Sequence, residues 1–368
     1  MADLFDITQI NNMTLANRFV RSATWEGMAA EDGAVTPKLI ETVTQLAQGG
    51  VGLIISGHSY VLPEGQAGPL QMGIYKDDLV DGLKSMTDAV HQAGGKMVAQ
   101  LAHAGTFAAE TLTRTPPHVV SLFDGLAKTP RHELTISDIQ KLVSAYVRAA
   151  ERAKTAGFDG VQIHAAHGYL FSQFLSPVYN RRQDAYGGSI ENRSRALCET
   201  VAAVRQAVGP DFPVLVKINA RDDVEGGLTL EDSVAAAGLL AQAGIDAIEV
   251  SGGFLTSKTW SPSRIGINKP EKEAYFEQGA AACKQTLDIP VILVGGIRSI
   301  EKARELVAGG TADYISLCRP LIREPGLINR WRSGDTRPAL CSSDNLCFRP
   351  AFKGEGICCV TEQRERSE

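Results

Sequence analysis

The 368-residue chain has little of what marks an exported, membrane-bound or nucleic-acid-binding protein. Its N-terminus, MADLFDITQI, carries acidic residues where a signal peptide has a basic region followed by an apolar core. No apolar run approaches the length of a membrane span. The formal net charge is -5 and no stretch is rich in lysine or arginine, which argues against binding to DNA or RNA. We therefore expect a cytoplasmic protein that acts on a small molecule.

Cysteine usage argues against a disulfide framework. The seven cysteines are an odd number, and they are dispersed along a long chain without a recognisable signal peptide. This usage is typical of reduced thiols. Hydrophobic residues make up 44% of the chain and charged residues 21%, and there are 36 glycines, a composition typical of soluble α/β proteins.

What the chain does have is a series of short apolar runs separated by segments with a helical pattern. Runs that are apolar on both faces are typical of parallel strands, because helices cover each side of a parallel sheet. We expect strands at residues 19–24, 51–57, 96–102, 158–165, 213–219, 247–253, 290–296 and 312–318.

The segment 137–157 illustrates the expected helices. Ser137 can cap its start with Gln140 reaching back, and Gly157 can end it. The buried stripe is expected at Ile139, Leu142, Val143, Tyr146 and Val147, which fall at helical spacing.

Eight strand–helix units predict a single closed (β/α)8 barrel, or TIM barrel, of the α/β class. The alternative, a doubly wound open sheet, favours a glycine-rich dinucleotide-binding turn after its first strand, and none follows FVRSAT. We assign residues 1–325 to the barrel. Residues 326–368 show no helical or strand period and hold four of the seven cysteines. We expect them to form an irregular C-terminal extension rather than an independent domain.

Polar side chains follow most of these strands, at the end where such a barrel has its active site. The densest group is His164-Ala165-Ala166-His167-Gly168-Tyr169, after the fourth run. Histidine is a hydrogen-bond donor near neutral pH and tyrosine is a weak acid with a pKa near ~10. Three such side chains around one pocket could bind an oxygen atom and deliver a proton beside it. A metal site on the two histidines is an alternative, although no third ligand is evident.

The other strand ends favour a phosphate group and a flavin ring. Glycine pairs after the sixth and seventh runs, with Arg319 after the eighth, match the usual phosphate site of these barrels. Glycine lets backbone N–H groups approach phosphate oxygens, and arginine binds them through two parallel hydrogen bonds. Gln100 can hydrogen-bond a ring amide in both directions, and Lys217 can place positive charge near a ring that becomes anionic on reduction. Together these features describe flavin mononucleotide (FMN).

The motifs NRFVRSAT, QLAHAG, HAAHGYLFSQFLSP, DAYGGSIENR, VGGI and CRP resemble those of the old yellow enzyme family of FMN-dependent NAD(P)H:flavin oxidoreductases. The resemblance runs from about Leu4 to Pro325 and rests most on HAAHGYL, FLSP and YGGSIENR. It implies a barrel fold, FMN as cofactor, NADH or NADPH as reductant, and a homo-oligomer.

The resemblance also implies roles for individual residues. His164 and His167 would hydrogen-bond a substrate carbonyl oxygen and stabilise an enolate, and Tyr169 would give a proton to the α carbon. Flavin N5 would supply the hydride. The FMN contacts implied by matching positions are Ala23, Thr24, Gly57, His58, Gln100, Lys217, Gly253, Gly295, Gly296, Cys318 and Arg319. Trp25, with His164, His167 and Tyr169, would contact the substrate.

The chain departs from the family pattern at two of these places. Lys217 stands where many members have arginine, which keeps the charge but loses the planar fork. Ala23-Thr24-Trp25 stands where many members have a proline followed by a cysteine or threonine. We expect Trp25 or Thr24 to fill that position.

The tail cysteines depart further. Larger members of the family carry a four-iron cluster in a Cys-x2-Cys-x3-Cys…Cys segment after the barrel. Here Asp344 stands where a second thiolate is expected between Cys341 and Cys347, and Cys358-Cys359 follow. Such a cluster uses four thiolates, so we expect a degenerate remnant without an iron–sulfur cluster. A structural zinc site using Cys341, Cys347 and Cys358 or Cys359 is an alternative.

The function we expect from these residues is NAD(P)H-dependent reduction of α,β-unsaturated carbonyl compounds on FMN. One alternative is an FMN dehydrogenase that oxidises an amine or a cyclic carbonyl compound. Another is a non-enzymatic flavin redox sensor in which the cysteine tail responds.

Overall fold

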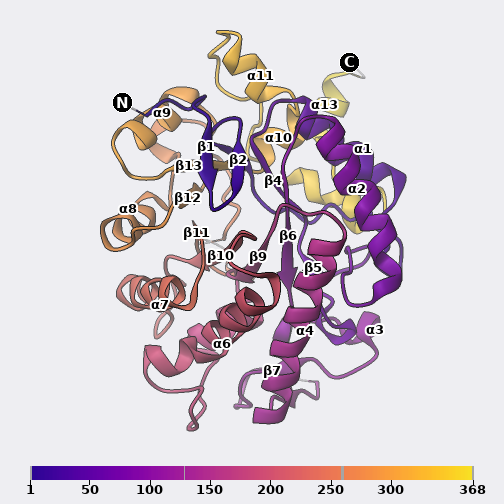
Figure 1. The fold of residues 1–368 in the computed structure, drawn as a ribbon, viewed down its shortest axis with the longest axis vertical. Coiled ribbons are helices and arrows are strands. Elements are labelled where there is room, and N and C mark those ends of the chain that lie inside the picture. Colours follow the sequence, from indigo (N-terminus) through magenta and orange to yellow (C-terminus); the bar gives the residue numbers. More distant parts are fainter. Residues whose placement is uncertain (1, 128, 258–260, 367–368) are drawn as a thin grey trace.

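The computed structural model describes residues 2–127, 129–257 and 261–366. Within these residues, all eight predicted strands are present. They are β3 (Phe19–Arg21), β4 (Leu53–Ile55), β6 (Met97–Ala102), β9 (Gly160–Ala165), β10 (Val214–Asn219), β11 (Ala247–Ser251), β12 (Val291–Val294) and β13 (Tyr314–Leu317). Each is parallel to its neighbours, and the ring closes where β13 pairs with β3 and β4 pairs with β6. The predicted TIM barrel is confirmed (Figure 1).

Helices follow the strands and cover the outside of the barrel (Figure 1). The longer ones are α1 (Pro37–Gln48), α2 (Val80–Gln92), α4 (Ile136–Thr155), α6 (Ile190–Val208), α7 (Leu230–Ala243), α8 (Glu277–Thr286) and α9 (Ile300–Ala308). The shorter ones are α3 (Glu110–Thr113), α5 (Leu170–Leu175) and α10 (Arg319–Arg323). Strand β5 (Ser59–Tyr60) extends the edge beside β6, and β7 (His118–Val119) pairs with β8 (His132–Glu133). In the described residues, no helix is both long and apolar enough to cross a membrane.

The cap of α4 differs from the prediction. Thr135, not Ser137, is the N-cap: its hydroxyl accepts a hydrogen bond from the Asp138 backbone N–H, and the Asp138 carboxylate accepts one from the Thr135 N–H. The Thr135–Asp138 pair has the same spacing as the predicted Ser137–Gln140 pair, and its carboxylate also interacts favourably with the positive end of the helix. The C-terminal end is as predicted, because Gly157 follows in a left-handed conformation, with φ of +82°.

A hairpin closes the N-terminal end of the barrel. Strands β1 (Thr8–Ile10) and β2 (Met13–Leu15) pair in antiparallel fashion. Ile10, Met13 and Leu15 are buried against the side chains that point into the barrel, such as Val20 and Leu215. Because the hairpin closes this end, the site lies at the opposite end of the barrel, where the strands finish.

The tail after residue 325 is more regular than predicted. It contains α11 (Leu327–Arg332), α12 (Arg349–Phe352) and α13 (Val360–Glu365). These helices have four to six residues, which is too short for a helical period to show in the sequence. Tertiary packing holds them: the Trp331 ring is fully buried with its centroid 5.5 Å from that of Phe19.

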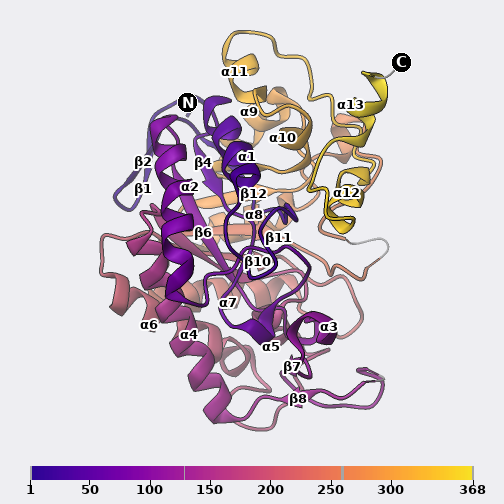
Figure 2. The same cartoon turned by 90° about the vertical axis from the view of Figure 1, so that its right-hand side faces the viewer.

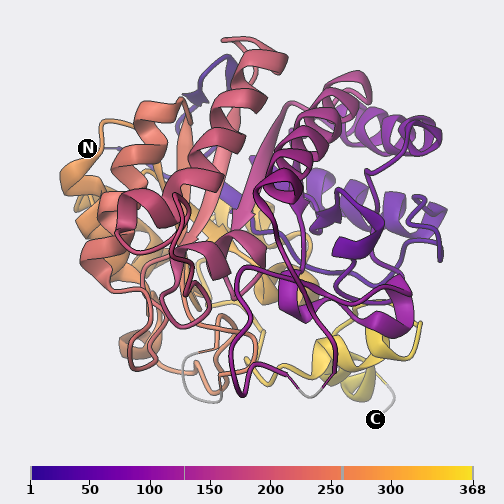
Figure 3. The ribbon, with the colours of Figure 1, turned by 90° about the horizontal axis from the view of Figure 1, so that it is seen from below.

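The tail also packs against α1 and α10 on the outside of the barrel. Residues of α1, α10 and α13 line one small cavity of about 280 Å³, and α13 lies close to α10 in both Figure 1 and Figure 2. Seen from below, the loops and the yellow tail helices lie together on the side of the molecule away from the long helices (Figure 3).

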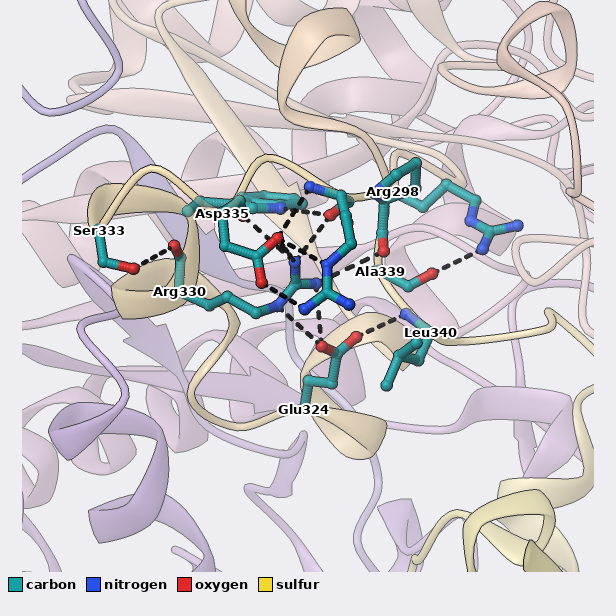
Figure 4. A network of polar contacts seen from close by, with 10 residues as sticks. Arg298, Glu324, Arg330, Ser333, Asp335, Ala339 and Leu340 are labelled. Atoms are coloured by element: carbon teal, nitrogen blue, oxygen red, sulfur yellow. Dashed lines mark hydrogen bonds and ion pairs between the residues drawn. The ribbon is translucent and has the colours of Figure 1, made fainter.

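An ionic network secures the start of the tail (Figure 4). Arg330 donates to Glu324 Oε1 at 2.9 and 3.1 Å, and also to the Asp335 backbone carbonyl at 3.2 Å. The other oxygen of Glu324 accepts the backbone N–H of Leu340 at 2.5 Å. Arg298, after β12, donates to the Ala339 carbonyl at 2.6 Å. One arginine–glutamate pair therefore joins the end of the barrel to the segment that leads into the cysteine region.

We expect Arg330→Met to lower the free energy of unfolding by about 1.5–3 kcal/mol, because it removes charge-assisted hydrogen bonds and leaves Glu324 unpaired. Urea unfolding followed by circular dichroism measures this. The matched control is Lys84→Met, which breaks the exposed Lys84–Asp88 pair and should cost only about 0.3–0.5 kcal/mol. A loss no larger than that of the control would show that the network does not hold the tail.

Candidate active site

A cavity of about 460 Å³ opens at the C-terminal ends of the barrel strands. Each strand, or the turn directly after it, contributes to its lining. The contributing side chains include Ser22, His58, Gln100, His164, Lys217, Ser251, Val294 and Cys318, in chain order from β3 to β13. The loop after β11 and the C-terminal tail complete the lining. Such a position is the usual one for the active site of a TIM barrel.

The two histidines and the tyrosine of the sequence motif meet in one wall. The ring centroid of His164 is 5.2 Å from that of His167 and 4.9 Å from that of Tyr169, both edge to face. The turn after β9 makes this possible, because His167 and Gly168 adopt left-handed conformations, with φ of +64° and +85°. The His167 backbone N–H donates to Asn219 Oδ1 at 3.0 Å, so a β10 side chain holds this strained turn.

Both imidazoles are held neutral. Burial, together with the neighbouring histidine and Lys217, keeps the pKa of His164 well below its usual range. Burial and Lys217 do the same to the pKa of His167. His164 Nδ1 accepts the Ala166 backbone N–H at 3.3 Å, so the proton of the neutral ring is on Nε2. His167 Nε2 lies 2.7 Å from Ser251 Oγ. The wall therefore offers uncharged N–H groups.

A buried polar chain orients Gln100. Its Nε2 donates to Gln162 Oε1 at 2.7 Å, and Gln162 Nε2 donates to Glu249 Oε2 at 3.0 Å. A carboxylate can only accept, so the direction of both amides is determined. Gln100 Oε1 is then left buried, with no hydrogen-bond partner among the described residues. An acceptor of this kind fits the ring N–H of a flavin.

The same carboxylate anchors the cationic side chain of the site. Lys217 Nζ lies 3.2 Å from Glu249 Oε1 and donates to Ser22 Oγ at 2.7 Å. Glu249 Oε1 also accepts from Ser22 Oγ at 2.7 Å and from Ser316 Oγ at 2.9 Å. Burial alone would raise the pKa of Glu249, but Lys217 and these hydrogen bonds lower it below the usual value. The glutamate is therefore ionised and holds the lysine in place.

Two of the residues expected to bind a phosphate group line the same cavity. Gly296, with φ of +72°, and Arg319 both line it. Arg319 donates to the Arg264 carbonyl at 2.8 Å and to Asn345 Oδ1 at 2.7 Å. Asn345 belongs to the tail, and its Nδ2 donates to the Ser263 carbonyl at 2.6 Å. The tail thus fixes the arginine and the loop after β11 together.

Aromatic side chains form the mouth. Trp25 lines the cavity, and its ring centroid lies 4.8 Å from that of Phe352 on α12. Trp25 Nε1 donates to the Pro69 carbonyl at 3.2 Å, which fixes the ring. Phe348 lines the same region. Trp25 and Thr24, either of which was expected to fill the place after β3, both line the cavity, and the tail supplies the aromatic partner of Trp25.

Most of the predicted residues line the cavity, but three glycines do not. The predicted residues found in the lining are Ala23, Thr24, Trp25, His58, Gln100, His164, His167, Tyr169, Lys217, Gly296, Cys318 and Arg319. Among the described residues, Gly57, Gly253 and Gly295 lie outside the lining. Gly57 has a packing reason to be glycine: an added Cβ would lie 2.2 Å from Glu26 Oε2 and 2.8 Å from the Thr24 carbonyl oxygen.

The sequence analysis missed several residues of the site. Glu249 and Gln162 carry the polar chain, and their sequence signal was a polar side chain inside an otherwise apolar strand. Asn345, Phe348 and Phe352 had no comparable signal, because they follow the barrel by tens of residues and reach the cavity only when the tail folds back.

In the described part of the chain, the tail cysteines do not come together with other side chains as a group of candidate metal ligands. In residues 2–127, 129–257 and 261–366, no three histidine, cysteine or acidic side chains are grouped as metal ligands. Asp344 instead accepts from Ser342 Oγ and Thr361 Oγ1 at 2.8 Å and from the Leu346 N–H at 2.9 Å. Cys341, Cys347, Cys358 and Cys359 are free thiols.

Comparison with known proteins agrees with this geometry. Residues 3–337 match the model of the NADH:flavin oxidoreductase / NADH oxidase family. The chain belongs to this family. The resemblance predicted from the motifs is thereby confirmed, together with FMN and a nicotinamide as its cofactors.

Individual relatives show how far the similarity extends. An NADH oxidase of Thermoanaerobacter brockii is 38% identical over 336 residues, which cover 88% of this chain and 50% of that protein. A 2-naphthoyl-CoA reductase structure superposes with a TM-score of 0.88 at 27% identity, covering 97% of this chain and 56% of the other. The old yellow enzyme homologue of Zymomonas mobilis gives a TM-score of 0.78 at 28% identity, covering 93% and 96%. The chain spans about half the length of the first two.

The carboxyl of Glu26 is buried beside Gly57. Its residue is 8% exposed, and burial raises the pKa of Glu26 to about 7, with Arg21 opposing part of that rise. Burial thus stabilises the protonated form of this carboxyl in the folded protein.

We expect the wild type to lose stability relative to Glu26→Gln as the pH rises from about 4.5 to about 7. In that window the unfolded chain has released the proton of Glu26 and the folded protein still holds it, so folding becomes less favourable with each step in pH. The interval corresponds to roughly 3 kcal/mol.

Urea unfolding of both proteins at pH 5 and pH 8 checks this. The control is Glu110→Gln on the exposed side of α3, outside the cavity. Parallel pH profiles for the wild type and Glu26→Gln would contradict the expected burial of this carboxyl.

Proposed function

We propose that this protein is an FMN-dependent NAD(P)H oxidoreductase that reduces the C=C bond of α,β-unsaturated carbonyl compounds. The observation that carries the proposal is one cavity in which two neutral imidazoles and a phenol face the residues expected to hold a flavin. Residues 1–325 and 326–368 act as one unit in this proposal, because tail residues line the cavity.

The residues present fit FMN. Gln100 Oε1 is a buried acceptor without a partner among the described residues, suited to a ring N–H, and Lys217 supplies positive charge. Arg319 and Gly296 would hold the phosphate, as in other barrels of this type. The remaining proposed contacts are Ala23, Thr24, His58 and Cys318 in the lining, together with Gly57, Gly253 and Gly295 outside it. When bound and reduced by NADH or NADPH, FMN supplies the hydride.

The imidazoles would bind the carbonyl oxygen of the substrate. The His164 Nε2–H is available because Nδ1 already accepts a backbone N–H. His167 reaches the same region and is positioned by Ser251 and Asn219. Neutral donors in a buried site stabilise the negative charge that develops on the oxygen as an enolate forms. Their low pKa values preserve this donor state across the physiological pH range.

Tyr169 would donate the proton to the α carbon. Burial raises the pKa of Tyr169, so its hydroxyl stays protonated until a strong base, such as the enolate, forms beside it. Its ring stands edge to face against His164, so acid and oxygen-binding group lie in one wall.

We expect Tyr169→Phe to slow the reoxidation of the reduced enzyme by 2-cyclohexenone by about 10²–10⁴-fold, because the general acid is lost. Reduction of the flavin by NADH or NADPH should be unchanged. Anaerobic stopped-flow absorbance measures the two steps separately.

The control for Tyr169→Phe is Tyr146→Phe, which removes a buried hydroxyl on α4, away from the cavity. If the reduced wild-type enzyme is not reoxidised by any enone, the ene-reductase proposal is wrong. In that case, the hypothesis to test is that the same FMN oxidises an amine or a cyclic carbonyl compound.

We expect Arg319→Met to weaken FMN binding about 10- to 100-fold, the equivalent of about 1.5–3 kcal/mol for lost charge-assisted hydrogen bonds. Titration of the FMN-free protein with FMN, followed by flavin fluorescence, measures it. Arg323→Met is the control on the same helix: Arg323 pairs with Glu365 outside the cavity, so its loss should leave FMN affinity unchanged. Equal affinities for the wild type and Arg319→Met would exclude Arg319 as a phosphate ligand.

A further inference from the structure

Gln71 is a buried amide that the proposed mechanism does not use, and it contacts His58 directly. Its residue is 1% exposed. Gln71 Oε1 accepts the backbone N–H of Ala67 at 2.7 Å and that of Gly68 at 3.4 Å. Gln71 Nε2 lies 2.9 Å from the His58 carbonyl oxygen and 2.6 Å from His58 Nδ1. All four hydrogen-bonding positions of the amide are therefore used.

These contacts leave the amide one orientation. Rotated by 180°, Nε2 would face the N–H donors of Ala67 and Gly68, and Oε1 would face the His58 carbonyl, so three of the four hydrogen bonds would be lost and only one to His58 Nδ1 could remain. Nε2 must therefore donate to His58 Nδ1, and Nδ1 must be unprotonated. Burial lowers the pKa of His58 to about 4, so at neutral pH the ring is uncharged and its single proton is on Nε2.

The protonated nitrogen of His58 faces Tyr169. His58 Nε2 lies 3.4 Å from the Tyr169 hydroxyl oxygen, and the two rings stand edge to face at 5.3 Å. Since Nε2 carries a proton, it donates to the phenol oxygen. The Tyr169 hydroxyl therefore cannot donate a hydrogen bond to His58, and its proton is free to point into the cavity.

We propose that Gln71 is a positioning residue that fixes His58 as a hydrogen-bond donor to Tyr169 and so leaves the phenolic proton for the substrate. The inference rests on the proposed role of Tyr169 as the acid. In that step the O–H bond of Tyr169 breaks and a C–H bond forms at the α carbon, using the electron pair of the enolate. The phenolate that remains accepts the N–H of His58 and regains a proton from water.

The opposite tautomer would work against the reaction. With the proton on Nδ1, Nε2 would be a lone-pair acceptor, and the Tyr169 hydroxyl would donate to it. The Tyr169 hydroxyl would then have to break that hydrogen bond before it could protonate the substrate. The phenolate that remains would be repelled by the lone pair of His58 Nε2. Gln71 therefore acts on the chemistry through His58 and touches neither substrate nor flavin.

The first test reads the tautomer directly in the FMN-bound wild type. Two-bond ¹⁵N–¹H correlation spectra of protein labelled at histidine nitrogens distinguish Nε2–H from Nδ1–H rings, and the seven histidines make assignment practical. The signals of His58 are those lost in His58→Asn. We expect the Nε2–H form for His58 at neutral pH. An Nδ1–H ring in the wild type would overturn the proposal without any variant of Gln71.

The second test changes the donor. Gln71→Glu keeps the size and the acceptor oxygen but replaces the donating NH₂ with a second acceptor, so it should convert His58 to the Nδ1–H form. Gln71→Met removes the amide altogether and provides a second variant if the first does not fold. We expect either one to slow enone-dependent reoxidation by about tenfold or more, part of the 10²–10⁴ attributed to a general acid. Reduction by NADH or NADPH should be unchanged.

Gln66→Met is the matched control. Gln66 is a buried amide in the same loop, where its Nε2 donates to the Gly68 carbonyl at 3.0 Å. Its amide hydrogen-bonds within the loop and not to His58, so its loss reports on loop packing and should leave both steps unchanged. A loss as large as that of Gln71→Glu would mean that loop structure, not the tautomer, controls the rate.

A combined variant separates this proposal from the proposed function. If Gln71 acts through Tyr169, Gln71→Glu should cause no further loss in the Tyr169→Phe background. Full enone activity of Tyr169→Phe would defeat the assignment of the acid. A large effect of Tyr169→Phe with no effect of Gln71→Glu or Gln71→Met would defeat the role of Gln71 alone.

Discussion

The buried carboxylate of Glu249 is the interaction on which the rest of the site depends. It lies inside the barrel on β11 and accepts hydrogen bonds from Ser22 after β3, Gln162 on β9 and Ser316 on β13, while Lys217 of β10 lies at 3.2 Å. An ionised group this deep is tolerated only when charge and hydrogen bonds replace its hydration. Meeting that requirement draws side chains from five strands to one point.

The donor and acceptor roles fixed at Glu249 determine those of the side chains that lead from it to the cavity. Because Glu249 can only accept, Gln162 must donate to it and Gln100 must donate to Gln162. The acceptor of Gln100 is thereby left facing the position proposed for the flavin. The same logic of fixed amides recurs at Gln71, where two backbone N–H groups determine which nitrogen of His58 is protonated. In both places, a group that can only accept or only donate hydrogen bonds determines the orientation of a side-chain amide. The amide in turn determines whether the next side chain acts as a donor or as an acceptor.

The tail contributes as much to the cavity as some of the strands. Its cysteines resemble a cluster-binding segment in sequence, yet Asp344 turns to Ser342 and Thr361. The segment forms part of the cavity lining. Asn345 accepts a hydrogen bond from Arg319, and Phe352 packs on Trp25. The Arg330–Glu324 pair at its start brings the chain back towards the barrel. The departures from the family pattern at Trp25 and in the tail therefore occur on facing surfaces of one pocket.

Much of this could be predicted from the sequence because it is local. An apolar run shows a buried strand in its own residues, and the His164–Tyr169 motif lies within six positions at the end of one. The cap at Thr135 was missed for an equally local reason, since two capping patterns overlap and packing chooses between them. The tertiary structure alone decided which elements meet: Phe352 of the tail lies against Trp25, Glu249 pairs with Lys217 on the neighbouring strand, and Gln71 folds back on His58. Those contacts depend on where the tail returns, on the register between strands and on the path of a loop, and no periodicity in the sequence records any of them.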